Sequence, residues 1–232
     1  MYHQVTLENS SQVDPKWTEH MRFLASSEKY QIIIPREKLS QKKLNLCLTF
    51  DDATADFYFH VFPLIKKFNI KVVLAVPAGL IPERTNLSPE DRMKIKDLWI
   101  PDALCTWPEL KEMADSGLVQ MASHGMNHQS FRNKNLDFLL EAQESKKLLE
   151  KKLGIEIKTF VYPYGQDARE AHQKLVKIYQ TIMRVGHAVN FSWERLGSMH
   201  YRVSADKYWK LGLRPKVTVG LIFKRIKCFF RF

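Results

Sequence analysis

Two pairs of metal-binding residue types follow apolar runs in this sequence. Asp51 and Asp52 come directly after the alternating residues 44–50, and His124 and His128 follow residues 118–122. Burying two adjacent carboxylates is costly unless a cation or a proton compensates their charge. Two imidazoles and one carboxylate would hold a divalent metal ion and leave one position for water. We therefore expect a metal site, and zinc is the ion that we favour.

Neither pattern is specific by itself. Two histidines four residues apart share one face of a helix, but histidine is also common on solvated helix faces. Adjacent aspartates are routine in turns and at helix starts. The combination, with each pair at the end of an expected strand, is what favours metal. A bound ion would lower the pKa of water, and an aspartate that is not a ligand would be free to act as general base. Amide or ester hydrolysis suits this set of residues.

The elements that must position these residues alternate between strands and helices. Hydrophobic periodicity and capping signals predict strands at 31–34, 44–50, 72–76, 118–122, 157–161, 181–185 and 201–204, and helices at 15–26, 57–69, 106–117, 135–153 and 169–178. Residues 80–105 contain three prolines and are expected to form an insertion, helical around 90–96. This alternation predicts βα units and a parallel sheet, whose strand ends meet on one face.

The charge of the chain is concentrated at its end. Residues 207–232 carry eight Lys or Arg and no acid, so they supply 8 of the net +11 and leave +3 for the rest. Aromatic residues alternate with these cations, which suits an interfacial helix at 216–232 on anionic lipid; a terminal helix packed on the body is the alternative. No helix-turn-helix, zinc-finger or RNA-stacking motif accompanies the charge, so we expect no nucleic-acid partner.

The three cysteines indicate no disulfide framework. The first residues lack the pattern of a secretory signal, and no run of 18 apolar residues occurs. We expect a cytoplasmic protein, peripheral on the inner face of the membrane if the basic segment binds lipid.

Three short segments resemble the motifs of the polysaccharide deacetylase family (NodB homology, carbohydrate esterase family 4). Residues 49–53 resemble its T-F-D-D-G motif with Ala53 in place of glycine, residues 123–128 its H-[S/T]-x-x-H motif, and residues 160–165 its R-P-P-Y-G segment. The order of the segments matches, and the resemblance covers residues 44–204. It implies a single-domain α/β fold, a distorted (β/α)7-type barrel at 44–206. From the residues themselves we expect 1–43 to pack on the barrel as a helix and a strand, and 207–232 to form a basic tail.

The resemblance also implies a role for each residue of the motifs. These roles are general base for Asp51, metal ligands for Asp52, His124 and His128, and an oxyanion donor in the backbone N–H of Tyr164, which the rigid Pro163 helps to hold.

Two features of the family pattern lack an obvious counterpart. Val161 stands where the family often has an arginine that pairs with the base; Arg184 is a candidate substitute, and a structural salt bridge is the alternative for it. The L-x-H motif that supplies the general acid is missing. We assign that role to His187, which follows the expected strand 181–185, whereas His200 precedes its strand and is expected on the opposite side. Without such an acid, the proton would return from Asp51.

The residues and the resemblance together predict a metal-dependent hydrolase that removes an N-acetyl group from an amino sugar. We expect a lipid-linked or nucleotide-linked substrate, met during assembly of a lipopolysaccharide, a capsule or a similar glycan. A deformylase of a lipid-linked amino sugar and a catalytically silent glycan-binding barrel are the alternatives.

Overall fold

Six parallel strands form the main sheet of this computed structural model, which describes residues 1–3, 5, 12–186, 190, 192–194 and 199–205. The strands pair in chain order: β3 (Thr49–Phe50), β4 (Val72–Val76), β5 (Val119–Ser123), β6 (Thr159–Val161), β7 (Thr181–Val185) and β8 (Met199–Arg202). Two further strands, β1 (Tyr30–Ile32) and β2 (Leu44–Leu46), form a separate parallel pair. The expected α/β architecture with parallel pairing is confirmed.

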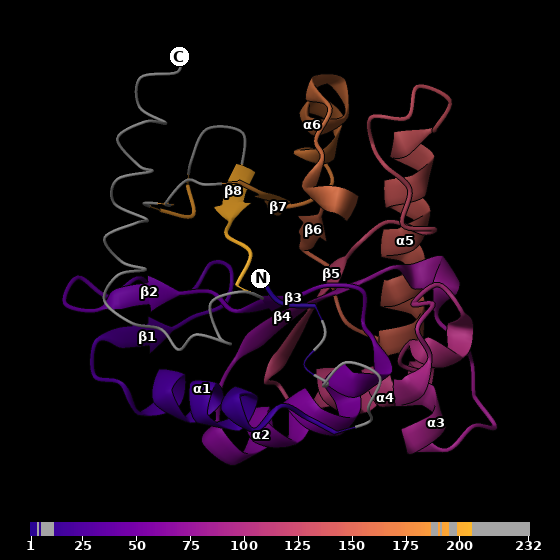
Figure 1. The fold of residues 1–232 in the computed structure, drawn as a ribbon. Helices are drawn as coiled ribbons and strands as arrows, with labels where there is room; N and C mark the ends of the chain where they lie inside the picture. The colour runs from indigo at the N-terminus through magenta and orange to yellow at the C-terminus, as the bar shows by residue number, and fades with distance from the viewer. Residues whose placement is uncertain (4, 6–11, 187–189, 191, 195–198, 206–232) are drawn as a thin grey trace.

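Helices surround the outer face of the curled sheet (Figure 1). They are α1 (Pro15–Ser26), α2 (Phe62–Phe68), α3 (Pro89–Lys94), α4 (Trp107–Asp115), α5 (Phe138–Leu153) and α6 (Arg169–Leu175). Their ends follow local rules. The Thr106 hydroxyl and the Glu109 carboxylate form the expected capping box at the start of α4, and Gly154 ends α5 with a φ of 69°.

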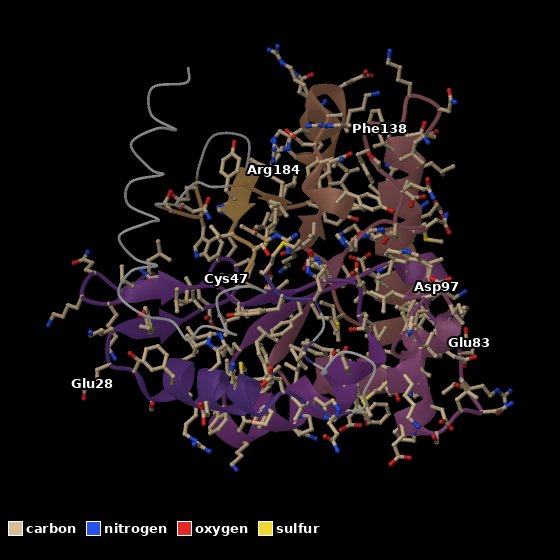
Figure 2. All side chains as sticks on the ribbon, in the orientation of Figure 1. Glu28, Cys47, Glu83, Asp97, Phe138 and Arg184 are labelled. Atoms are coloured by element: carbon tan, nitrogen blue, oxygen red, sulfur yellow. The ribbon has the colours of Figure 1, made fainter. Side chains whose placement is uncertain are left out.

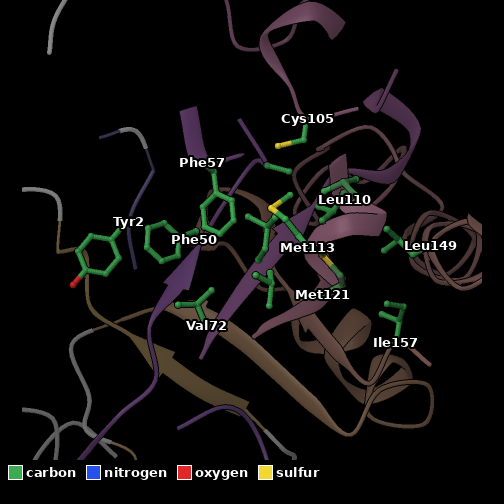
Figure 3. Close-up of a cluster of buried hydrophobic side chains, with 14 of the residues drawn as sticks. Tyr2, Phe50, Phe57, Val72, Cys105, Leu110, Met113, Met121, Leu149 and Ile157 are labelled. Atoms are coloured by element: carbon green, nitrogen blue, oxygen red, sulfur yellow. The ribbon is translucent and has the colours of Figure 1, made fainter. Parts of the chain in front are cut away.

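Side-chain alternation gives the sheet two apolar faces. Val72, Leu74 and Val76 point into the large core between strands and helices, part of which Figure 3 shows around Phe50, Val72 and Met121. The intervening Val73 and Ala75 point the other way. They form a smaller cluster on the inner face with Ala122, Val161 and Met183. These side chains fill the inner face of the curled sheet.

The first residues of the chain lie between the two outermost strands, β3 and β8. The Tyr2 N–H donates to the Thr49 carbonyl at 2.8 Å, and the Asp51 N–H donates to the Tyr2 carbonyl at 3.1 Å. On the other side, the Met1 nitrogen donates to the Val203 carbonyl at 2.7 Å. We call this junction between β3 and β8, with Met1 and Tyr2 in it, the seam. It joins the two edges of the sheet without direct strand pairing between them.

Several expected elements differ in detail. The expected strand 44–50 is divided, because β2 pairs with β1 whereas β3 pairs with β4. The expected helix 57–69 begins as a π-helical turn, η1 (Phe57–Val61), and continues as the α-helix α2, which has Pro63 in its first turn. The last strand lies two residues earlier than expected, at 199–202. Among the described residues, no helix has the length and hydrophobicity needed to cross a membrane.

Candidate active site

Asp52, His124 and His128 converge on one point although 72 residues separate the first two. The Nε2 atoms of His124 and His128 lie 3.5 and 3.3 Å from Asp52 Oδ1. The three potential ligand atoms all lie within 4.8 Å of one another, and all three residues are buried. A tetrahedral set of ligands at zinc-like distances places neighbouring donor atoms about 3.4 Å apart. The spacing therefore fits a small divalent ion.

Hydrogen bonding around His124 gives a second test of that fit. Its Nδ1 lies 2.8 Å from the Val161 carbonyl oxygen, which accepts only, so Nδ1 carries the proton. The other ring nitrogen, Nε2, is therefore the atom available to a metal ion, and it faces Asp52 Oδ1, a buried oxygen with no hydrogen-bond partner among the described residues. Burial also lowers the pKa of His128, outweighing the opposing effect of the Asp52 carboxylate. Lone pairs facing one another in a buried site are stabilised by a cation.

The two histidines lie on a loop and not on a helix, so their four-residue spacing does not align them as it would on a helical turn. His124 follows β5, and the chain turns through Gly125 (φ 80°) and His128 (φ 53°). Glu141 of α5 stabilises this loop. Its buried carboxylate accepts from the Asn127 N–H at 2.6 Å. A Cβ on Gly125 would lie 3.1 Å from Glu141 Oε1, so loop and helix approach closely here.

Left-handed backbone conformations gather around this point. Asp52, Ala53, His128 and Tyr164 have φ values of 73°, 54°, 53° and 56°. A residue other than glycine costs about 1–2 kcal/mol in this conformation. Such strain is characteristic of functional sites, where the surrounding structure imposes it. The conformation of Ala53 also explains why glycine suits this position in the T-F-D-D-G motif.

Asp51 lies beside the cluster and has a different partner. Arg202 Nη1 donates to Asp51 Oδ1 at 2.5 Å and Nη2 donates to Oδ2 at 2.8 Å, in a bidentate ion pair that is almost fully buried. Burial on its own raises the pKa of Asp51, but the charge and hydrogen bonds of Arg202 outweigh it and hold the pKa below its usual range. The carboxylate is therefore ionised and fixed at neutral pH.

Arg202 is the site residue that the sequence analysis missed. Arg184, the candidate considered, instead binds Asp167, and Figure 2 labels it beside β7 and β8. Val161 packs in the inner apolar cluster. The arginine thus comes from β8, two strands further along the sheet. The available signal was the alternation of apolar and polar residues in 199–202. A strand with these bounds has Arg202 at its carboxyl end, where Asp51 also lies.

The remaining expected residues have different outcomes. His187 lies outside the described residues. His200 is inside β8 rather than before it, and its Nε2 is 3.2 Å from the Ser192 carbonyl oxygen. Pro163 is buried in a 3-10 turn, η4 (Pro163–Gly165). Tyr164 follows it, with its ring centroid 4.6 Å from that of His128.

Comparisons with known proteins agree on one family. A family model described as polysaccharide deacetylase matches residues 38–182. A putative polysaccharide deacetylase of Bacillus subtilis is 27% identical over 175 residues, which are 72% of this chain and 56% of that protein. A poly-beta-1,6-N-acetyl-D-glucosamine N-deacetylase of Staphylococcus aureus is 26% identical over 161 residues, 65% of this chain and 50% of that protein. The chain thus spans about half the length of these curated relatives.

The fold is shared with solved structures. The IcaB structure from Ammonifex degensii superposes with a TM-score of 0.73 at 20% identity, covering 95% of this chain and 94% of that one. This likeness supports the expected (β/α)7-type barrel in a single domain, curled here around six parallel strands.

Proposed function

This chain belongs to the polysaccharide deacetylase family, and we propose that it is a metal-dependent hydrolase that removes the N-acetyl group from an amino sugar of a glycan. One observation carries the proposal. The cluster of Asp52, His124 and His128 suits a divalent ion, and a separate ionised carboxylate, Asp51, lies immediately beside it. A site that only bound metal or glycan would have no use for a second buried carboxylate held by its own arginine.

Asp52, His124 and His128 would hold the ion, and zinc is the identity we propose. When bound, such an ion supplies a Lewis acid that polarises an amide carbonyl and acidifies water. The chain's own residues then handle the proton. Asp51 accepts it from the water that attacks the amide carbonyl, and Arg202 keeps that carboxylate ionised and oriented until the transfer occurs.

The rest of the reaction needs an oxyanion donor and a proton for the leaving amine. By analogy with the family motif, the Tyr164 backbone N–H stabilises the oxyanion, and the buried Pro163 restricts the backbone before it. As the C–N bond breaks, the amine takes a proton from His187 or from the protonated Asp51, and acetate and the free amino sugar leave. His187 remains the acid we propose.

The proposed substrate is an N-acetylated hexosamine polymer or its precursor. Relatives named as poly-beta-1,6-N-acetyl-D-glucosamine N-deacetylases favour the polymer. The basic, aromatic residues 207–232 favour a lipid-linked intermediate at the cytoplasmic face of a membrane, as in assembly of a lipopolysaccharide or capsule. We place the polymer first because it rests on similarity across the barrel.

Acetate release tests the proposal. Purified protein is incubated with a β-1,6-linked pentamer of N-acetylglucosamine, and separately with lipid-linked N-acetylhexosamine, after chelation and after reloading with zinc. We expect acetate only from the reloaded protein and none from an Asp51→Asn variant that retains its metal. No acetate from any of these substrates, or equal release by the chelated protein, would contradict the proposed function.

A further inference from the structure

Two exposed aromatic rings pack against the candidate metal ligand His128. The Trp99 ring stacks on the imidazole with centroids 4.2 Å apart and planes tilted by 31°, whereas Tyr164 meets it edge-on at 4.6 Å and 67°. His128 is only 6% exposed, but Trp99 and Tyr164 remain 41% and 60% exposed. Both rings therefore contact His128 and still offer apolar surface to solvent.

The insertion between β4 and α4 holds Trp99 in a defined place. Arg92 of α3 is buried, and both of its terminal nitrogens donate to Glu109, at 2.6 and 2.9 Å. It also donates to the carbonyls of Asp102 and Leu104, at 3.2 and 2.6 Å. Since Arg92 precedes Trp99 and the two carbonyls follow it, these bonds close the insertion at its base.

The tip of the insertion is also structured. The Trp99 N–H donates to Asp97 Oδ1 at 3.0 Å, and the Ile100 N–H donates to the Asp97 carbonyl at 3.2 Å. Figure 2 shows Glu83 and Asp97 of this insertion at the right of the molecule, near α5. Trp99 is thus part of a fixed turn, and its ring needs little ordering on ligand binding.

Tyr164 is fixed by its backbone. Its φ of 56° is unfavourable for a residue with a side chain, and it lies between the buried Pro163 and Gly165. A Cβ on Gly165 would lie 2.5 Å from the Val185 side chain, so the turn has no room to shift toward β7. The exposed phenol ring is consequently held beside His128.

We propose that Trp99 and Tyr164 form a sugar-binding subsite that takes a pyranose ring of an N-acetylated hexosamine oligosaccharide. One face of a pyranose presents C–H groups and packs well on an aromatic face, while its hydroxyls stay hydrated. Trp99 supplies the larger aromatic face, and Tyr164 adds a second exposed ring beside the same histidine. This inference rests on the proposed function and deepens it, because it names the residues that would select a polymer over a free monosaccharide.

A purely shielding role for Trp99 would have different consequences. A ring that only covered His128 would change metal retention and leave oligosaccharide binding alone. A sugar platform would change oligosaccharide binding and leave the metal content alone. Measuring both quantities on the same protein separates the two roles.

The test uses titration calorimetry with the β-1,6-linked N-acetylglucosamine pentamer on the zinc-loaded chain of 232 residues carrying Asp51→Asn, which prevents turnover. We expect Trp99→Ala to weaken pentamer binding about tenfold and Trp99→Phe to weaken it no more than about threefold, with zinc content unchanged in both. Binding of N-acetylglucosamine itself is expected to be much weaker than that of the pentamer. Phe23→Ala on α1 is the matched control, because Phe23 is also 41% exposed and lies on another element.

Three results would overturn the inference: absence of pentamer binding to the parent protein, unchanged binding after Trp99→Ala, or loss of zinc after Trp99→Ala. Failure of the proposed function is a separate result. A chain that releases no acetate but binds the pentamer through Trp99 would refute the deacetylase and retain the subsite. A chain that releases acetate with the same KM after Trp99→Ala would refute the subsite alone.

Discussion

The two sides of the candidate active site are built differently. On the β3–β5 side, neighbouring strands pair directly, and the metal-binding residues follow them within a few residues. At the seam, β3 and β8 are joined through Met1 and Tyr2 and through the buried Asp51–Arg202 ion pair. The first side depends on short local motifs, and the second depends on partners about 150 residues apart. Local pattern therefore predicts the metal ligands, whereas the environment of the base depends on the curled sheet that brings β8 close to β3.

Removing Arg202 gives the largest expected effect. Arg202→Met leaves the buried Asp51 carboxylate without a counter-charge, next to Asp52, and breaking a buried pair in this way costs about 3–5 kcal/mol. Urea unfolding followed by circular dichroism measures the change in the free energy of unfolding. Arg202→Lys is expected to restore only part of it, because an ammonium cannot make the bidentate contact.

Arg184→Met is the matched control for that experiment. Its guanidinium is partly exposed and pairs with Asp167 at the surface, so we expect a loss of no more than about 1 kcal/mol. Equal losses for the two arginine variants would contradict the assignment of Arg202 to the base.

Acid is expected to weaken the seam through His20. This buried imidazole lies 2.8 Å from the Tyr2 hydroxyl, and burial lowers its pKa to about 4 from the ordinary 6.5. Between those pH values the unfolded state binds more protons than the folded state. The contribution of His20 to the free energy of unfolding is therefore fully present above pH 6.5 and is lost as the pH falls toward 4. The loss from this group is roughly 3 kcal/mol.

Unfolding free energies measured from pH 7 to pH 4 test this, with His20→Gln as the variant. The replacement is expected to remove roughly that part of the pH dependence. Tyr2→Phe keeps the aromatic ring and is expected to leave the pH dependence of the unfolding free energy in place, because burial, and not the Tyr2 hydroxyl, lowers the pKa of His20. A pH dependence that is identical in the wild type and His20→Gln would show that His20 is not its source.

A smaller effect is expected from Glu141 on the β3–β5 side. Glu141→Gln weakens the contact to the Asn127 N–H that shapes the loop between His124 and His128, and support of this kind is worth about tenfold in metal affinity. Competition with a chromogenic chelator measures the affinity. Glu144→Gln, an exposed neighbour paired with Lys147, is the control and should change nothing. Equal affinities for the two variants would mean that Glu141 does not support the site.

Much of the fold follows from the sequence, since the strands 72–76 and 181–185 and the helix 15–26 lie where hydrophobic pattern and capping residues predict them. The split of residues 44–50 does not, because alternation within a run says nothing about which neighbours its two halves pair with. The π-helical turn before Pro63 and the loop at His124–His128 are likewise set by tertiary packing. For the site, motifs predicted which residues meet, and only the three-dimensional closure of β8 on β3 revealed Arg202.

The central claim is that Asp51 and Asp52 have separate roles, and two asparagine variants test it together. Metal content and acetate release from the N-acetylglucosamine pentamer are measured for Asp51→Asn and Asp52→Asn. We predict that Asp51→Asn keeps its bound metal and loses about 10²–10⁴-fold in turnover, whereas Asp52→Asn loses metal and turnover together. Full turnover in Asp51→Asn, or loss of its metal, would contradict the account.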